Sequence, residues 1–323
     1  MPLPPFIERD GDPQIPPPYW FPGVTIRSFR LTATLVALQA LCDRLLNIGT
    51  LAQRGFEYLA FLPFVDLEVL TYPRMESEVP HHRLKGFTAQ REAYFRLFVA
   101  KFEAIGLGWF PTEIAVFIPF IFVDNNWSVI AGREVVGYPK VQAKIEIPPP
   151  KGFPLFPMLF GKPRPYPMTM STDVFATYGP NTRQISEKVV EIEEASPNPS
   201  ILGTYSNWPW GVLDLAGLDP QLVRVVQEFM RPDSFSTIQL KQIRDAENTG
   251  EACYQALVHG EFQVSGISTP DPLPPAKIAI HSYASLPIVA ELGLGSSTLQ
   301  PLSQYAVKCD MRSRNTYNIF VLP

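Results

Sequence analysis

The sequence predicts an α+β protein built on a mainly antiparallel sheet or barrel, with a few peripheral helices. Prolines number 35 in 323 residues, a share that excludes a helical bundle because proline interrupts helix interiors. Short stretches rich in apolar and β-branched residues recur from residue 110 onward, as is typical of strands. Only two or three segments have helical spacing, and this mixture of elements favours the α+β class.

The N-terminal third is expected to hold an arm, two helices and a strand. Residues 1–20 are rich in proline and predict an extended arm, and the length of the chain suggests one large domain or two modest ones. Leucines at helical intervals predict a helix over Leu35–Asn47. Tyr58–Tyr72 has the composition of a strand. A second helix is predicted over Thr88–Ile105, where large apolar residues again recur every three or four positions.

The middle of the chain has the composition and residue pattern of β-strands. Glu113–Val123 is a nearly continuous apolar run, which indicates a strand buried on both faces. Asp124–Asn126 has turn chemistry, and Ser128–Val136 is predicted to be the next strand. Gly137–Pro139 interrupts the pattern. Lys140–Ile147 then alternates strictly between polar and apolar residues, as a half-buried strand does.

The C-terminal half predicts further strands and one helix. Asp219 as cap and Pro220 at the first helical position mark the start of this helix. The segment from Pro148 to Pro167 is rich in proline, and its interleaved phenylalanines indicate that it packs against other residues. Strand-like stretches are Met168–Tyr178, Val189–Ile192, Thr237–Ile243, Tyr254–Val264 and Ile278–Val289.

Composition narrows the classes of partner. The formal net charge is −4, which argues against a nucleic-acid partner or an anionic membrane surface. The longest apolar candidate, Tyr58–Leu70, is interrupted by Pro63 and two acids, so no membrane-spanning helix is expected. The N-terminus lacks the pattern of a secretory signal. Three widely spaced cysteines indicate neither a disulfide framework nor a zinc site, so a cytoplasmic location is expected.

One segment, Gly132–Lys140 (GREVVGYPK), places a lysine directly after a rigid turn between two apolar strands. A lysine held in such a place loses hydration, and desolvation favours the neutral amine. A neutral lysine amine can attack a carbonyl group and form a Schiff base. The plain alternative is that Lys140 opens a solvated strand face together with Gln142 and Lys144.

This segment resembles the signature of the acetoacetate decarboxylase family, in which the lysine after Tyr/Phe-Pro forms the imine. Thr112-Glu113 followed by Ile118-Pro119 is similar to the family's T-E-x-x-x-x-I-P strand, and Val123–Asn125 resembles its L-D-N turn. The order of these motifs along the chain is that of the family. The likeness extends over about residues 21–320 and is specific at 110–147. It implies a cone-shaped, mainly antiparallel β-barrel and a homo-oligomer.

The resemblance also implies roles for individual residues. Lys140 would be the Schiff-base nucleophile and Glu113 a carboxylate that handles protons or orients the substrate. Arg133 and Glu134 would support the site as an ion pair, with Tyr138 beside them. One departure bears on the reaction: decarboxylases of the family carry a second lysine directly after the nucleophile, where this chain has Val141.

The leading hypothesis is therefore a lyase that forms a Schiff base with a keto acid or related carbonyl substrate, for decarboxylation or for aldol and dehydration chemistry. No cofactor or metal is expected, because the lysine itself is the electrophilic catalyst. The alternative is a non-catalytic barrel that binds an apolar, carbonyl-containing small molecule. The expected partner in either case is a small molecule, and not a nucleic acid or a membrane.

Overall fold

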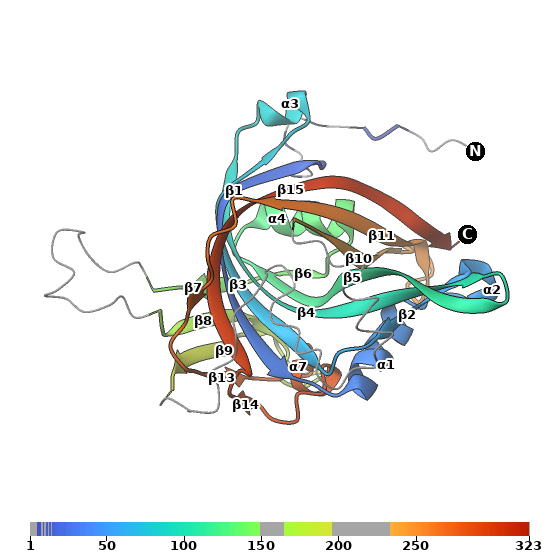
Figure 1. Ribbon diagram of the computed structural model, residues 1–323. Coiled ribbons are helices and arrows are strands. Elements are labelled where there is room, and N and C mark those ends of the chain that lie inside the picture. Colours follow the sequence, from blue (N-terminus) through green and yellow to red (C-terminus); the bar gives the residue numbers. More distant parts are fainter. Residues whose placement is uncertain are drawn as a thin grey trace, which may run out of the picture.

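The computed structural model describes residues 15–148, 165–195 and 233–322, together with 5–7, 9, 11 and 13. Most of its elements are strands, which form two sheets (Figure 1). The predicted α+β class with mainly antiparallel strands and few helices is confirmed. The expected helix after Asp219 and nearly all of the Pro148–Pro167 segment lie outside the described residues.

The larger sheet has ten strands, and most of its neighbours are antiparallel. β5 pairs in parallel with β6 and with β10. β4 pairs with β3 along one edge and with β5 along the other, so the strand order returns to its own beginning. The strands are β1 (Tyr19–Thr32), β2 (Phe56–Ala60), β3 (Phe64–Ser77), β4 (Thr88–Ile105), β5 (Gly108–Val123), β6 (Lys140–Gln142), β10 (Ser234–Arg244), β11 (Ala252–Ser265), β12 (Asp271–Pro272) and β15 (Ser303–Leu322).

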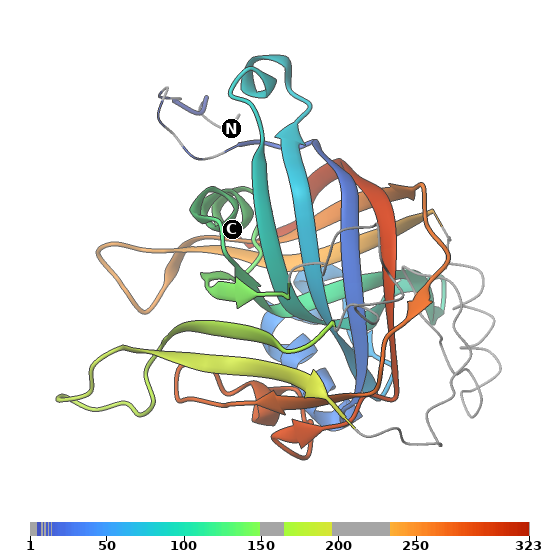
Figure 2. The same ribbon diagram turned by 90° about the vertical axis from the view of Figure 1, so that its left-hand side faces the viewer.

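The smaller sheet has five strands in the order β14-β13-β9-β8-β7. Figure 2 shows β8 and β9, in yellow-green, lying across the lower ends of the upright strands of the larger sheet. Its strands are β7 (Lys144–Glu146), β8 (Met168–Val174), β9 (Ile185–Glu194), β13 (Ala276–Ile280) and β14 (Thr298–Leu299). The short run from β6 to β7 therefore leaves one sheet and enters the other.

The first predicted helix is confirmed as α1 (Leu35–Leu45), which buries Leu38, Leu41 and Cys42. These residues pack against the outer face of the larger sheet in one apolar cluster with the smaller sheet. The other helices of the described chain are short: α2 (Leu51–Arg54), α3 (Pro80–Arg83), α4 (Asn126–Ala131), a π-helix (Gly132–Val136) and α7 (Ile288–Glu291).

The strand predicted over Tyr58–Tyr72 is divided into β2 and β3, and two further predicted elements have the wrong secondary structure. The helix expected over Thr88–Ile105 is the long strand β4, and both of its faces are buried, so its sequence lacks the alternation that marks a half-buried strand. The strand expected over Ser128–Val136 is α4 followed by the π-helix. The side chain of Asn125 caps α4 by accepting a hydrogen bond from the amide of Ser128, and this cap outweighs the β-branched residues that follow.

The two faces of the larger sheet have different surroundings. Alternate residues of β4, such as Phe95 and Leu97, join the cluster shared with α1 and the smaller sheet. The intervening residues, such as Tyr94 and Phe98, face the interior that the curved strands enclose. This interior holds the buried side chains of Lys140, Glu92 and Arg96, and a cavity lies within it.

In the described part of the chain, no helix is both long and apolar enough to cross a membrane.

Candidate active site

Lys140 is placed by a sharp change of direction in the backbone. The π-helix ends at Gly137, whose φ of 87° lies in the left-handed region, where only glycine is free of strain. Tyr138 and Pro139 then lead into β6, which pairs with the end of β5 so that Lys140 lies beside Ile121. Lys140 is 8% exposed. The alternative, that Lys140 opens a solvated strand face, is therefore wrong.

The aliphatic part of Lys140 runs across Gly132, the first residue of the π-helix. A Cβ atom at position 132 would lie 2.5 Å from Cδ and 2.6 Å from Cε of the lysine, closer than carbon atoms approach. Glycine is thus needed at this position to let the lysine side chain extend into the interior.

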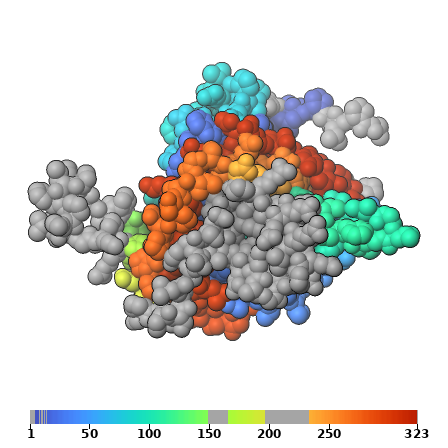
Figure 3. Space-filling model, viewed as in Figure 1, coloured from blue at the N-terminus to red at the C-terminus, as the bar shows by residue number. Residues whose placement is uncertain are grey.

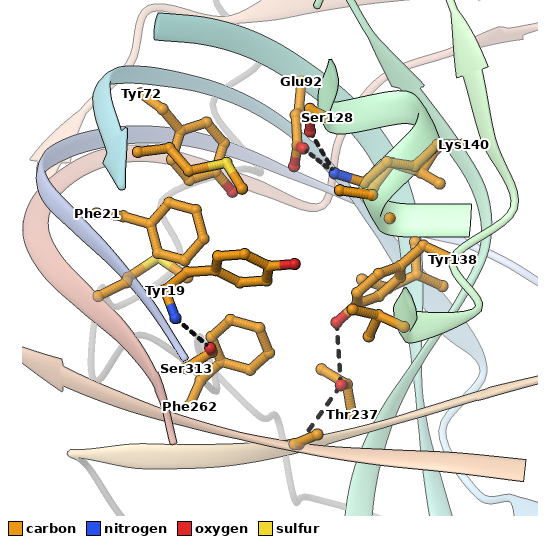
Figure 4. A pocket seen from close by; sticks show the side chains of 18 of the residues that line it. Tyr19, Phe21, Tyr72, Glu92, Ser128, Tyr138, Lys140, Thr237, Phe262 and Ser313 are labelled. Carbon is orange, nitrogen blue, oxygen red and sulfur yellow. Dashed lines mark hydrogen bonds and ion pairs between the residues drawn. The ribbon is translucent and has the colours of Figure 1, made fainter. Parts of the chain in front are cut away.

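The amine of Lys140 contacts two side chains at the end of this path (Figure 4). Its Nζ donates to Oε1 of Glu92 at 2.6 Å and to Oγ of Ser128 at 2.8 Å. Glu92 lies on β4 and is 5% exposed, and Ser128 lies in α4 and is 2% exposed. The Nε2 of Gln90 donates to the same Glu92 oxygen at 2.9 Å. A buried amine, a carboxylate and a hydroxyl are therefore in direct contact.

These groups open into a cavity of about 70 Å³. Apart from Lys140 and Glu92, no ionisable Lys, Arg, His, Asp or Glu side chain among the described residues lines it. Its wall is mostly apolar and includes seven aromatic side chains: Tyr19, Phe21, Tyr72, Tyr94, Tyr138, Phe235 and Phe262.

The tyrosines of this wall are held in their neutral form. Burial, and next the carboxylate of Glu92, raise the pKa of Tyr72 well above its ordinary value. Burial, and next Glu68, do the same to the pKa of Tyr94. Burial also raises the pKa of Tyr138, whose hydroxyl lies 3.0 Å from that of Thr237. Neutral hydroxyl groups donate hydrogen bonds, and these donors are directed to partners within the protein.

A second group of charges lies next to the cavity in the same interior. Arg30 donates to both oxygens of Asp66, at 2.8 and 3.0 Å. Arg96 lies 2.9 Å from Glu68 and 3.3 Å from Asp66. Burial raises the pKa of Asp66, but the two arginines outweigh it and hold that pKa below its ordinary value. This cluster reaches the cavity through Tyr94, whose hydroxyl donates to Glu68 at 2.6 Å.

The structure does not bring Glu113 to Lys140. Glu113 lies eight residues before Ile121 on β5, which amounts to about 26 Å along a strand. It also lies on the opposite face of β5 from Ile118 and Ile121, which line the cavity. Its carboxylate contacts Nε2 of His259 at 2.6 Å. The carboxylate beside Lys140 is Glu92 instead.

Arg133 and Glu134 do not form an ion pair with each other. Both side chains are exposed, and Arg133 donates to the backbone carbonyl of Lys140 at 3.0 Å. Arg133 thus holds the backbone of β6 from outside the cavity. Tyr138 lies inside, with its ring 5.9 Å from the Nζ of Lys140.

The neighbouring positions supply no second amine. Val141 packs against the apolar cluster on the outer face, because successive residues of a strand point to opposite faces. Lys144 is 74% exposed and pairs with Glu146. No group of three His, Cys, Asp or Glu side chains within the described ranges is arranged to hold a metal ion.

Comparisons with known proteins find a family model and several solved structures that resemble this chain. Residues 61–153 match the model of the family described as acetoacetate decarboxylase (ADC), a range that includes Glu92, Ser128 and Lys140. No curated protein matches the sequence.

Solved structures match over nearly the whole chain. A structure of acetoacetate decarboxylase is 13% identical, with a TM-score of 0.54, and the match covers 96% of this chain and 93% of that one. An acetoacetate decarboxylase-like enzyme from Sphingomonas wittichii RW1 is 14% identical, with a TM-score of 0.54 and 96% of each chain covered. The enduracididine biosynthesis enzyme MppR complexed with pyruvate is 13% identical, with a TM-score of 0.51, and 96% of this chain and 93% of that one are covered. These likenesses establish the fold.

Proposed function

We propose that this acetoacetate decarboxylase-like protein is a lyase that forms a Schiff base between Lys140 and a keto acid or related carbonyl substrate. The observation that carries the proposal is the buried contact of the Lys140 amine with Glu92 and Ser128 at the wall of an apolar cavity. The resemblance confirmed over residues 61–153 is consistent with this chemistry, and one relative of the same fold is complexed with pyruvate, a small carbonyl compound.

The contact supplies the proton transfers that imine formation requires. Glu92 accepts a hydrogen bond from the amine at 2.6 Å, so it is placed to take a proton from the ammonium as a general base. The amine then attacks the carbonyl carbon, the electrons of the C=O double bond move to the oxygen, and one N–H proton of the attacking amine passes to that oxygen to give a hydroxyl group. Glu92 returns its proton to that hydroxyl, water leaves, and a protonated imine remains beside the carboxylate. The hydroxyl of Ser128 is placed to hold the amine during these steps.

Glu92 also explains how the site can work with Val141 in place of a second lysine. A neighbouring cation activates a lysine by disfavouring its charged form. A carboxylate in direct contact acts differently, because it accepts the proton as a base. Once the imine has formed, the same carboxylate can remove a proton from the adjacent carbon and give an enamine. The enamine serves aldol and dehydration chemistry, and the imine alone serves loss of CO₂.

The remaining predicted residues take supporting positions in this proposal. Arg133 holds the backbone of Lys140, and Tyr138 lines the cavity beside the amine. Glu134 is exposed and has no contact with the amine. Glu92, rather than Glu113, is the proton-handling carboxylate.

Reductive trapping tests the proposal. Cyanoborohydride, added with small 2-oxo and 3-oxo compounds, should leave a mass adduct that peptide mapping assigns to Lys140. Lys140→Met should lose the adduct, whereas Lys144→Met, a lysine on the same segment but exposed, should keep it. Adducts spread over surface lysines, or the same yield in Lys140→Met, would contradict the proposal.

A second candidate is a non-catalytic barrel that binds an apolar carbonyl compound, and the mostly apolar cavity wall favours it. A Lys140→Met variant that binds its ligand as tightly as the unmodified protein would support this alternative.

The proposal includes the wider expectations from the sequence. The strand order that returns through β4 and β5 supports the cone-shaped barrel, with residues 1–20 as an arm and 21–323 as one domain. A cytoplasmic homo-oligomer is expected. The turn between β4 and β5 supports assembly, because it exposes Ile105, Leu107, Trp109 and Phe110, and it projects from the body in Figure 3.

A further inference from the structure

We propose that the substrate of Lys140 is an uncharged ketone or aldehyde with an apolar body, and that the cavity selects against keto acids. This inference rests on the proposed function and narrows it to one substrate class. It follows from three features of the cavity: its charge balance, the direction of its hydroxyl groups, and an unpaired acceptor beside Glu92.

The charges of the cavity already balance. Lys140 is its one cationic side chain among the described residues, and Glu92 offsets it at 2.6 Å. A substrate carboxylate would therefore bring an uncompensated negative charge into a mostly apolar cavity. Burial of an unpaired charge is strongly unfavourable, and the nearby Glu92 carboxylate adds like-charge repulsion.

The two arginines nearest in the interior are held elsewhere. Arg30 makes two hydrogen bonds to Asp66, and Arg96 lies between Asp66 and Glu68. Neither side chain lines the cavity. Moving either arginine toward a substrate would take a partner away from a buried carboxylate, and this loss would strongly destabilise the fold.

Four hydroxyl groups of the wall, those of Tyr19, Tyr94, Tyr138 and Thr237, donate to partners within the protein. Tyr19 donates to the backbone carbonyl of Ile15, and Tyr94 donates to Glu68. Thr237 donates to the carbonyl of Gly260, so the proton shared between Tyr138 and Thr237 comes from Tyr138. These residues present oxygen lone pairs and aromatic ring faces to a ligand. A carboxylate needs several donors, and these four hydroxyl groups supply none.

Gln90 offers the opposite kind of group. Its amide nitrogen donates to Glu92, while its Oε1 is buried and has no hydrogen-bond partner among the described residues. The residue lines the cavity and is 5% exposed. An unpaired acceptor repels a carboxylate and fits a hydroxyl or N–H group. The cavity thus suits an uncharged carbonyl compound that carries such a donor.

Two matched pairs of probes test this inference in the full chain. Acetoacetate is compared with methyl acetoacetate, and pyruvate with methyl pyruvate, because each ester keeps the ketone and removes the charge. The measured quantity is the rate of cyanoborohydride-trapped adduct at Lys140, at equal concentration and pH 7. Each ester should react at least 10-fold faster than its acid, after correction for the rates with a free amine of a lysine peptide.

Two variants of Gln90 add a test of the electrostatic cause. Gln90→Lys places a positive charge beside Glu92 and should reduce the preference for the esters at least fivefold. Gln90→Met, which is similar in size, removes the unpaired acceptor but adds no charge, so the preference should fall less in this variant than in Gln90→Lys.

The outcomes separate this inference from the function on which it rests. Acids that react as fast as the esters, with the adduct still at Lys140, would overturn the substrate class and leave the Schiff base intact. A preference that Gln90→Lys does not change would remove the electrostatic explanation. No adduct at Lys140 with any of the four compounds would overturn the proposed function and this inference together.

Discussion

The carboxylate of Glu92 lies 2.6 Å from the amine of Lys140, and both side chains are buried. The two residues come from different parts of the larger sheet, since Glu92 is on β4 and Lys140 opens β6, and β5 lies between the two strands. Glu92 pairs with Val123 on β5, and Lys140 pairs with Ile121 on the same strand. The contact depends on both pairings. The contact between the amine and the carboxylate is therefore a property of the assembled sheet.

The choice between two carboxylates is directly testable. Glu92→Gln removes the base in contact with Lys140 and should slow adduct formation about 100-fold, within the range of general acid–base catalysis. Glu113→Gln changes a carboxylate that contacts His259. It should slow adduct formation much less than Glu92→Gln does. The rate at which the adduct is trapped at pH 7 measures the effect of each variant. A larger loss in Glu113→Gln would restore the role that the sequence motif implied for Glu113.

The approach of Lys140 across Gly132 makes a second prediction. Gly132→Ala adds a Cβ within 2.6 Å of the lysine side chain and should displace the amine from Glu92. Adduct formation should fall at least 10-fold, because small misplacements of a reacting group have large effects on rate. Gly250→Ala is a matched control, as its Cβ would lie 3.8 Å from its nearest neighbour. Equal rates in the two variants would contradict the geometry.

The buried arginine next to the cavity should contribute strongly to stability. Arg96 is 2% exposed and faces Asp66 and Glu68. Arg96→Met leaves two buried carboxylates short of a partner and should lower the free energy of unfolding by about 3–5 kcal/mol. Urea denaturation measures the change. Lys144→Met removes an exposed pair and should leave the midpoint unchanged. A midpoint for Arg96→Met like that of the control would contradict the prediction.

The same cluster predicts a dependence of stability on pH. The arginines hold the folded-state pKa of Asp66 below its ordinary value against the effect of burial. A carboxyl group of this kind stabilises the fold above its unfolded pKa of about 4, and the contribution is lost as the pH falls through the folded-state pKa. The difference in unfolding free energy between the unmodified protein and Asp66→Asn should therefore be largest near neutral pH and shrink below about pH 4. A difference that stays constant down to pH 3 would show that Asp66 is not the group responsible.

The exposed apolar residues of the β4–β5 turn predict how the chain assembles. If this turn forms a subunit contact, Leu107→Asp should lower the molar mass measured by light scattering, because a charge in an apolar contact is unfavourable. Leu84→Asp, at an exposed leucine of another segment, serves as the control. An unchanged mass in Leu107→Asp would remove this turn from the interface.

Local sequence patterns predict some elements of this structure correctly and others wrongly. The motif around Lys140 and the apolar run of β5 could be predicted because each is continuous in the sequence. β4 could not, because Tyr94, Leu97 and Phe98 have helical spacing while the strand is buried on both faces. Glu92 was missed for this reason: in a predicted helix, a glutamate has no reason to face the interior. Its contact with Lys140 follows from strand pairing across 48 residues, which no local pattern records.

Ser128 was missed for a related reason. Val129, Ile130, Val135 and Val136 favour a strand, and the N-terminal cap at Asn125 was interpreted as part of a turn. A capping asparagine three residues before a serine was the signal that could have indicated α4.

The pairing of β1 with β15 has a consequence for how the protein is made. Phe21 and Met311 are partners in this pairing, and both line the cavity. One wall of the cavity thus comes from β1 and the other from β15. Because Lys140 precedes Met311 in the chain, the cavity cannot close around the amine until translation has passed residue 311. Unfinished chains therefore hold a hydrated Lys140, and the enclosed amine that we propose as the nucleophile exists only in the completed sheet.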